Sequence, residues 1–269
     1  MRMLQPLLVA LTAATVGGCI ESTAIIKVNA DGSGTLAHRT LMNSAALAQM
    51  RQVSGALGGR QVVDPFSEEQ ARALAGSMGD AVTLVSSTPI AGDSTEGRAS
   101  LYAFKDVRKL QFKADPMPTN MATGGGAVGP QGGANALTFD LALNSAGNAV
   151  LTLHMPNSLV DSLVTMMRVK DSSLGASPLQ IFRQTLIGLR LALRIEPGGS
   201  LVRTTSPYVD GKAVTLFDMS FDDLANDDTV VSRVQEAKTT AEAKAVLKEI
   251  PGFKVNFDSE VTIEFTPAR

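Results

Sequence analysis

The groups in this chain that could do chemistry are few: one thiol, two imidazoles and a segment rich in carboxylates. Because Cys19 is the only cysteine, an internal disulfide is excluded, and so is a metal site built from several cysteine and histidine ligands. His38 and His154 stand far apart, and the spacing of serines and carboxylates around them does not predict a catalytic triad. The thiol is therefore the first candidate for a functional group.

Residues 1–18 have the pattern of a secretory signal peptide. A basic residue at position 2 is followed by a run without charge, and small residues precede the cysteine. The most apolar part, residues 7–16, is about half of the roughly 20 residues that a membrane-spanning helix needs. We therefore expect residues 1–18 to be removed on export.

The stretch Val16-Gly17-Gly18-Cys19 resembles the lipobox of bacterial lipoproteins. The resemblance implies cleavage after Gly18, a diacylglyceryl group on the sulfur of Cys19 and acylation of the new amine. The alternative is a buried free cysteine beside an uncleaved helix. Two or more acyl chains attach a protein stably to a bilayer. We therefore expect a bacterial envelope protein that faces the periplasm, and Ile20 after the cysteine favours the outer membrane over the inner.

Two segments have the outline of a functional motif, but a structural role is favoured for each. Residues 29–34 match the start of a calcium loop, but Thr40 stands where a bidentate glutamate is needed, which favours a hairpin turn. Residues 75–79, AGSMG, approach a nucleophile elbow. The expected helix precedes Ser77 and the expected strand follows it, which is the reverse of the elbow's order. We therefore interpret Ser77 as part of a helix end.

Five carboxylates gather near position 220, and such a cluster could bind a hard cation or raise the pKa of one of its members. Asp227 and Asp228 precede a run with helical periodicity, which favours helix capping and surface solvation over a metal site. We expect no metal and no cofactor. The cluster comprises Asp218, Asp222, Asp223, Asp227 and Asp228.

The composition excludes several binding functions. The formal net charge is −2 and no long basic stripe occurs, so nucleic-acid binding is excluded. The chain has no tryptophan and two tyrosines, which leaves few aromatic faces for stacking sugars or bases.

The segment 114–136 divides the chain after the signal peptide (1–18) into an N-terminal part, 19–113, and a C-terminal part, 137–269. Glycine, proline and alanine dominate this segment, which predicts a flexible loop or linker. Each part opens with a hairpin, and the turns are expected at 29–34 and 144–148.

Helices and further strands follow each hairpin. In the N-terminal part, the spacing of apolar residues predicts a helix over 43–58, and Ser67 with Gln70 predicts the capped start of another. Further strands are expected at 81–90, 98–104, 189–196, 213–221 and 259–267, and further helices near 227–237 and 240–249, the last capped by Thr239 and Glu242. The expected fold class is α+β, with antiparallel sheets built from hairpins and helices packed on one face.

Two resemblances bear on this organisation. The opening CIESTAIIKVNADGSGT resembles a group of uncharacterised bacterial lipoproteins in which a strand follows the lipobox cysteine at once, and it is similar to the LppM-type mycobacterial lipoproteins, an α/β module linked to envelope lipids. Neither resemblance implies a catalytic residue. Within the chain, IKVNADGSGTL and LRIEPGGSLV are alike, so two related halves are an alternative to a single unit.

These observations favour a non-catalytic envelope lipoprotein, a structural or partner-binding module held close to the membrane. Thr23, already in the expected first strand, is only four residues from Cys19, which leaves no long linker. One alternative is a binder or carrier of envelope lipids or other apolar ligands. The apolar face of a helix expected from residue 157 onwards could serve such a ligand or a protein partner, although most such faces are core. Its residues are Leu159, Leu163, Met166 and Met167. An envelope hydrolase is the least favoured alternative.

Overall fold

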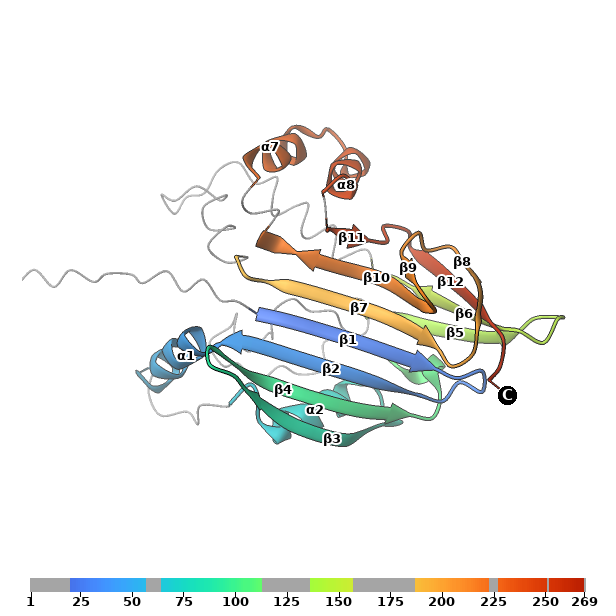
Figure 1. The fold of residues 1–269 in the computed structure, drawn as a ribbon, viewed down its shortest axis with the longest axis horizontal. Helices are drawn as coiled ribbons and strands as arrows, with labels where there is room; N and C mark the ends of the chain where they lie inside the picture. The colour runs from blue at the N-terminus through green and yellow to red at the C-terminus, as the bar shows by residue number, and fades with distance from the viewer. Residues whose placement is uncertain are drawn as a thin grey trace, which may run out of the picture.

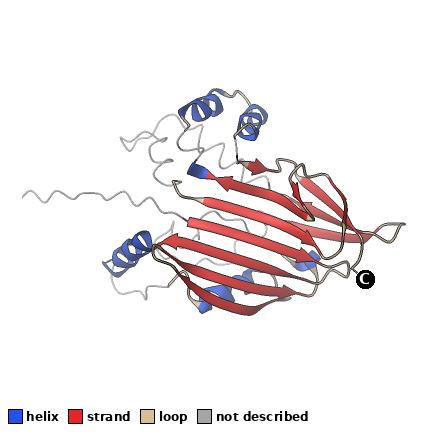
Figure 2. Ribbon diagram, in the orientation of Figure 1, coloured by secondary structure: helices blue, strands red, loops and turns tan. Residues whose placement is uncertain are grey.

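The computed structural model describes residues 20–56, 64–112, 136–156, 187–222, 227–250 and 252–268. Within these residues β-strands outnumber helices, and they form one eight-stranded and one four-stranded sheet (Figures 1 and 2). The α+β class is broadly consistent with this structure. The site residues predicted from the sequence, Gly18, Cys19, Leu159, Leu163, Met166 and Met167, lie outside the described residues.

The first hairpin joins β1 (Ile20–Val28) to β2 (Gly34–Asn43) in antiparallel register, from the pair Ile20 and Met42 to the pair Val28 and Gly34. The turn between them depends on Gly32, whose φ of 89° is accessible to glycine at little cost. Oδ1 of Asp31 accepts hydrogen bonds from the backbone N–H and the hydroxyl of Ser33, so this oxygen is engaged within the turn. The predicted hairpin turn is confirmed.

The eight-stranded sheet, called the large sheet below, has the order β11-β10-β7-β1-β2-β4-β3, and β9 pairs with β10. Its other strands are β3 (Val82–Ala91), β4 (Thr95–Phe104), β7 (Arg190–Pro197), β9 (Val209–Asp210), β10 (Ala213–Ser220) and β11 (Lys254–Val255). The pair β1 and β7 is parallel, whereas every other pair in this sheet is antiparallel. The expectation of purely antiparallel sheets is therefore wrong for the large sheet, because β1 and β7 are distant in sequence and no hairpin joins them.

The four-stranded sheet, called the small sheet below, is antiparallel throughout and has the order β5-β6-β12-β8. Its strands are β5 (Thr138–Leu143), β6 (Ala149–His154), β12 (Glu260–Phe265) and β8 (Leu201–Thr204). The hairpin of β5 and β6 turns at Asn144 to Asn148, as predicted, with Gly147 at a φ of 78°.

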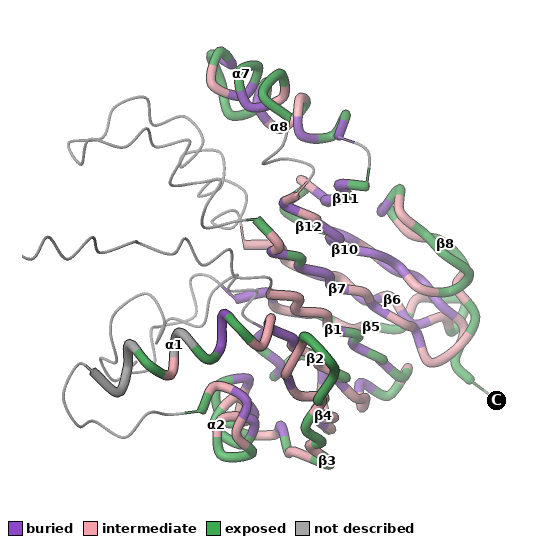
Figure 3. The backbone as a smooth tube through the Cα atoms, turned by 60° about the vertical axis from the view of Figure 1, so that its left-hand side comes forward, coloured by how far each residue is buried: buried purple, intermediate pink, exposed green. Residues whose placement is uncertain are grey.

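The two sheets share one hydrophobic core. Buried and exposed residues both occur along the strands of the large sheet (Figure 3). In β1 the burial alternates, so Ile26 and Val28 are fully buried on the face we call inner, while Ile25 is exposed on the face we call outer. The same cluster of buried side chains contains Leu193 from β7 and Phe265 from β12. Folding therefore buries apolar side chains of both sheets in the same core. This burial of apolar surface is the main source of stability for such a fold.

The helices lie at separate places around the sheets rather than as one layer (Figure 1). They are α1 (Ser44–Ala56), α2 (Glu68–Met78), α7 (Asp228–Glu236) and α8 (Thr240–Lys248), with a short 3-10 helix, η1 (Val107–Lys109). Helix α2 contacts β3, α1 contacts the end of β2, and α7 packs on α8. The predicted caps are confirmed: the hydroxyls of Ser67 and Thr239 accept from the backbone N–H groups of Gln70 and Glu242.

Candidate functional site

The anchor end of the large sheet is defined by the first residue of β1. Strand β1 begins at Ile20, the residue that follows Cys19 in the chain, and it lies in the middle of the large sheet between β2 and β7. The start of β7 and the end of β10 lie at the same end of the sheet, because Arg190 pairs with Glu21 and with Ser220. A group carried by Cys19 would therefore join the chain one residue from a central strand.

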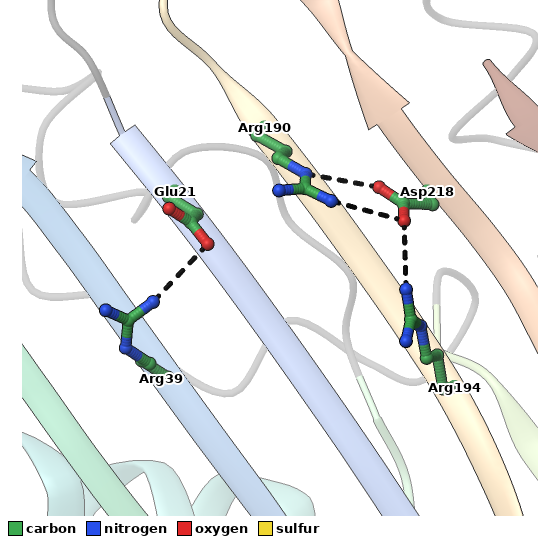
Figure 4. Close-up of polar contacts among 5 residues, drawn as sticks. All are labelled: Glu21, Arg39, Arg190, Arg194 and Asp218. Atoms are coloured by element: carbon green, nitrogen blue, oxygen red, sulfur yellow. Dashed lines mark hydrogen bonds and ion pairs between the residues drawn. The ribbon is translucent and has the colours of Figure 1, made fainter. Parts of the chain in front are cut away.

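The outer face of the large sheet carries a row of alternating charges near the anchor end (Figure 4). Arg39 of β2 lies 3.4 Å from Glu21 of β1. Arg190 and Arg194 of β7 both reach Asp218 of β10, at 3.2 and 3.3 Å. The hydrogen bonds and charge of Asp218 raise the pKa of Arg190, so this guanidinium stays charged. The row gives the outer face a polar, ion-paired surface across four strands.

This row accounts for one member of the carboxylate cluster, and other members have separate roles. The side chain of Asp218 is only 12 % exposed because two arginines cover it. Asp222 accepts a hydrogen bond from the backbone N–H of Gly188, at 2.6 Å. Asp227 caps α7 by accepting from Thr229 and Val230, as the capping interpretation predicted. In the described part of the chain, no group of three or more histidine, cysteine, aspartate or glutamate side chains is placed to hold a metal ion.

The inner face of the large sheet carries several polar side chains near the anchor end, beside a small apolar cluster that contains Met42 and Leu47. Ser22 Oγ of β1 lies 3.0 Å from His38 Nε2 of β2, and Thr40 Oγ1 lies 3.3 Å from the same nitrogen. Burial of the half-buried imidazole lowers the pKa of His38 to about 4, because the charged form loses its hydration. No carboxylate of the described residues bonds to His38, so a serine and a histidine meet here without the third group of a triad.

We predict that His38 makes the fold less stable as pH falls. Its imidazole is neutral in both states above about pH 6.5, but below that pH the unfolded chain binds a proton that the folded chain does not. The free energy of unfolding should therefore fall by at most about 2 kcal/mol between pH 7.5 and 5.0, measured by urea denaturation. His38→Gln should remove most of this loss, whereas His154→Gln should keep it. An unchanged pH dependence in His38→Gln would contradict the assignment.

The second histidine lies on the small sheet. His154 Nε2 of β6 is 2.9 Å from a carboxylate oxygen of Asp140 on β5, and its Nδ1 is 3.9 Å from Glu260 on β12. All three side chains are largely exposed, and such surface pairs contribute little to stability. Ser77, the other catalytic candidate, donates to the carbonyl of Leu74 within the last turn of α2, as expected for a helix end. His154 and Ser77 therefore lie on elements other than the two strands that carry Ser22 and His38.

The carboxylate of Glu264 on β12 joins the turn of the β5–β6 hairpin to the strands β12 and β8 by hydrogen bonds. Glu264 of β12 accepts from Asn148 at 2.8 Å, from Arg203 at 2.5 Å and from Asn144 at 2.7 Å. These hydrogen bonds lower the pKa of Glu264, with that from Asn148 first. The network stabilises the hairpin only while Glu264 is ionised. Its contribution is therefore present above the unfolded pKa and is lost as pH falls through the lowered folded value.

The sequence did not single out the ion-paired residues Glu21, Arg39, Arg190 and Arg194, or the buried Glu264. The strand 189–196 alternates leucine or isoleucine with arginine, alanine and glutamate, which indicates a polar face. The partners on that face depend on strand register, which this alternation leaves open.

No helix of the described residues is both long and apolar enough to cross a membrane. Comparison with known proteins finds no matching family model and no matching curated protein. Among solved structures, the chain has a likeness to the folded domain of LppM from Mycobacterium tuberculosis, determined by NMR. The likeness covers 93% of this chain and 91% of that one, at 8% sequence identity and a TM-score of 0.33. A likeness at this level establishes neither a family nor a function.

Proposed function

We propose that this protein is a lipid-anchored lipoprotein of a bacterial cell envelope, and that its folded domain is a non-catalytic structural or partner-binding module held close to the membrane. One observation carries the proposal: β1 begins directly after Cys19, the cysteine of the lipobox-like stretch. Consecutive Cα atoms are about 3.8 Å apart. An acylated Cys19 would therefore hold the anchor end of the large sheet beside the lipid headgroups.

The non-catalytic part of the proposal is supported by the separation of the reactive groups. His38 lies with hydroxyls on the large sheet, His154 lies with carboxylates on the small sheet, and Asp218 lies between two arginines. Ser22 and His38 lie within hydrogen-bond reach of each other, but none of the described carboxylates bonds to the imidazole to orient it, as the third group of a triad would.

The partner-binding part is supported by the outer face of the large sheet. Its row of alternating charges, from Arg39 to Asp218, suits a partner with complementary charges, because charge patterns of this kind select partners and orient their encounter. The proposed partners are the membrane, through Cys19, and another envelope protein, on this face. Ile20 after the cysteine favours the outer membrane.

The anchor is tested by the intact mass of the protein purified from its host membrane. The expected mature chain lacks residues 1–18 and carries the mass of two or more acyl chains, and Cys19→Ser should carry none. When the first 18 residues are replaced by an export signal that needs no lipid, Cys19→Ser should move wholly into the soluble envelope fraction. The chain that keeps its own first 18 residues and carries Ser22→Ala in place of Cys19→Ser is the matched control for a change near the strand start, and it should stay in the membrane fraction. A purified protein that keeps residues 1–18, or an unmodified thiol, would contradict the proposal.

A further inference from the structure

Arg98 of β4 differs from the other arginines in the described part of the chain. It is half-buried on the inner face of the large sheet, where it lies directly opposite Thr40 of β2. No carboxylate of the described residues lies within 4 Å of its guanidinium. All the other described arginines have such a partner: Arg39, Arg51, Arg72, Arg108, Arg190, Arg194, Arg203 and Arg233.

The guanidinium of Arg98 is held in place but is not saturated. Its Nε donates to the backbone carbonyl of Phe66, and Nη1 donates to Ser87 Oγ of β3 at 2.7 Å. A guanidinium has five N–H donors. The donors that remain, on Nη1 and Nη2, have no acceptor among the described residues. They form the planar fork that matches two oxygens of an anion.

Hydroxyl groups lie near Arg98. Ser87 Oγ, which accepts from Arg98, lies 3.2 Å from Ser100 Oγ, and Thr40 stands opposite Arg98 in register. Glu68 is near enough for the charge of Arg98 to act on its pKa, but its carboxylate is paired with Arg72 at 2.5 Å. The immediate surroundings of Arg98 are therefore a positive charge among neutral hydrogen-bonding groups.

We propose that Arg98, Ser87, Ser100 and Thr40 form a binding site for a phosphate group on the inner face of the large sheet. A phosphate offers more acceptor oxygens than a carboxylate, so it can bind the guanidinium fork and the neighbouring hydroxyls together. The site also lies near the anchor end, because Arg98, Thr40 and Ser22 face one another across three strands and β1 begins two residues before Ser22. Both free phosphate and the headgroup of a phospholipid fit this position.

The test is a calorimetric titration of the full chain, in detergent, with two separate probes: inorganic phosphate and dibutyryl phosphatidylglycerol, a phospholipid soluble in water. We expect Arg98→Gln and Arg98→Lys to weaken binding about tenfold or more, because the lysine keeps the charge but loses the fork. Ser87→Ala should weaken binding about fivefold. Because this variant keeps Arg98, it tests the site even if the Arg98 variants do not fold. Thermal unfolding by circular dichroism checks each variant.

Arg233→Gln is the matched control. It removes the same charge from an exposed side chain of helix α7, where the partner Glu249 is exposed as well, and it should change the affinity less than about twofold. Binding of both probes with the stated dependence on Arg98 supports a site for a free phosphate group, and binding of the lipid alone with that dependence supports a headgroup site. The proposal is overturned if neither probe binds the wild-type chain up to roughly 10 mM. It is overturned equally if Arg233→Gln weakens binding as much as Arg98→Gln does.

Discussion

Replacing Phe265 with alanine is expected to lower the free energy of unfolding by about 3–5 kcal/mol. The side chain of Phe265, on β12 of the small sheet, is 0% exposed and belongs to the same buried cluster as Ile26 and Leu193 of the large sheet. The loss would combine the transfer energy of the ring with the cost of the cavity left between the sheets. Because one core joins the sheets, the damage should spread to both.

Tyrosine fluorescence can follow the large sheet separately, since the chain has no tryptophan and two tyrosines. Tyr102 is buried on β4, so a Tyr208→Phe background leaves it as the reporter. In urea, the Tyr102 midpoint and the circular-dichroism midpoint should fall together in Phe265→Ala. Leu143→Ala, at a side chain 65% exposed at the end of β5, is the control and should change stability by less than about 0.5 kcal/mol. A Tyr102 midpoint that Phe265→Ala leaves unchanged would contradict a shared core.

Elements with a local signal were predictable from the sequence. Helix α2 begins where Ser67 caps it, α8 begins where Thr239 does, and the first hairpin turns at the glycine whose positive φ the turn needs. In each case the interaction that forms the boundary joins residues only a few positions apart. The sequence of that short stretch therefore contains both partners.

The arrangement of the sheets was not predictable in this way. Strand β7 pairs in parallel with β1, although Arg190 and Glu21 are far apart in the chain, and β12 lies between β6 and β8. The alternation of apolar and polar residues in a strand indicates which face is apolar, but it does not indicate which strand lies beside it. The choice depends on how well whole apolar faces fit together, which is a property of the completed core.

The candidate sites also differ in whether residues close together in the sequence are enough to predict them. The polar identity of Arg190, Arg194 and Asp218 is visible in their strands, but their ion pairs exist only because β7 and β10 are neighbours. For Arg98 the informative feature is a missing partner, and a missing partner becomes visible only when the surrounding strands are in place. The lipobox-like stretch is the opposite case, because its recognition needs only consecutive residues.

Gly97→Ala should destabilise the protein by about 3 kcal/mol or more, which is a large part of the roughly 5–15 kcal/mol by which native proteins are stable. Gly97 lies in β4 opposite Leu41 of β2. A Cβ atom there would lie 2.0 Å from the carbonyl oxygen of Thr40 and 2.9 Å from the Cα of Leu41. Both obstacles are backbone atoms of β2, which pairs with β1 on its other side and cannot move away without breaking a second pairing.

The same substitution at Gly76 is a control with the opposite sign. Gly76 is exposed in α2, and a Cβ there would meet nothing within 4 Å. Alanine should therefore stabilise the helix by about 0.5–1 kcal/mol, because it restricts the unfolded chain more than glycine does. Urea unfolding of both variants beside the wild type measures the two effects. If Gly97→Ala unfolds at the wild-type midpoint, the close approach of β4 to β2 is wrong, and with it the register that places Arg98 opposite Thr40.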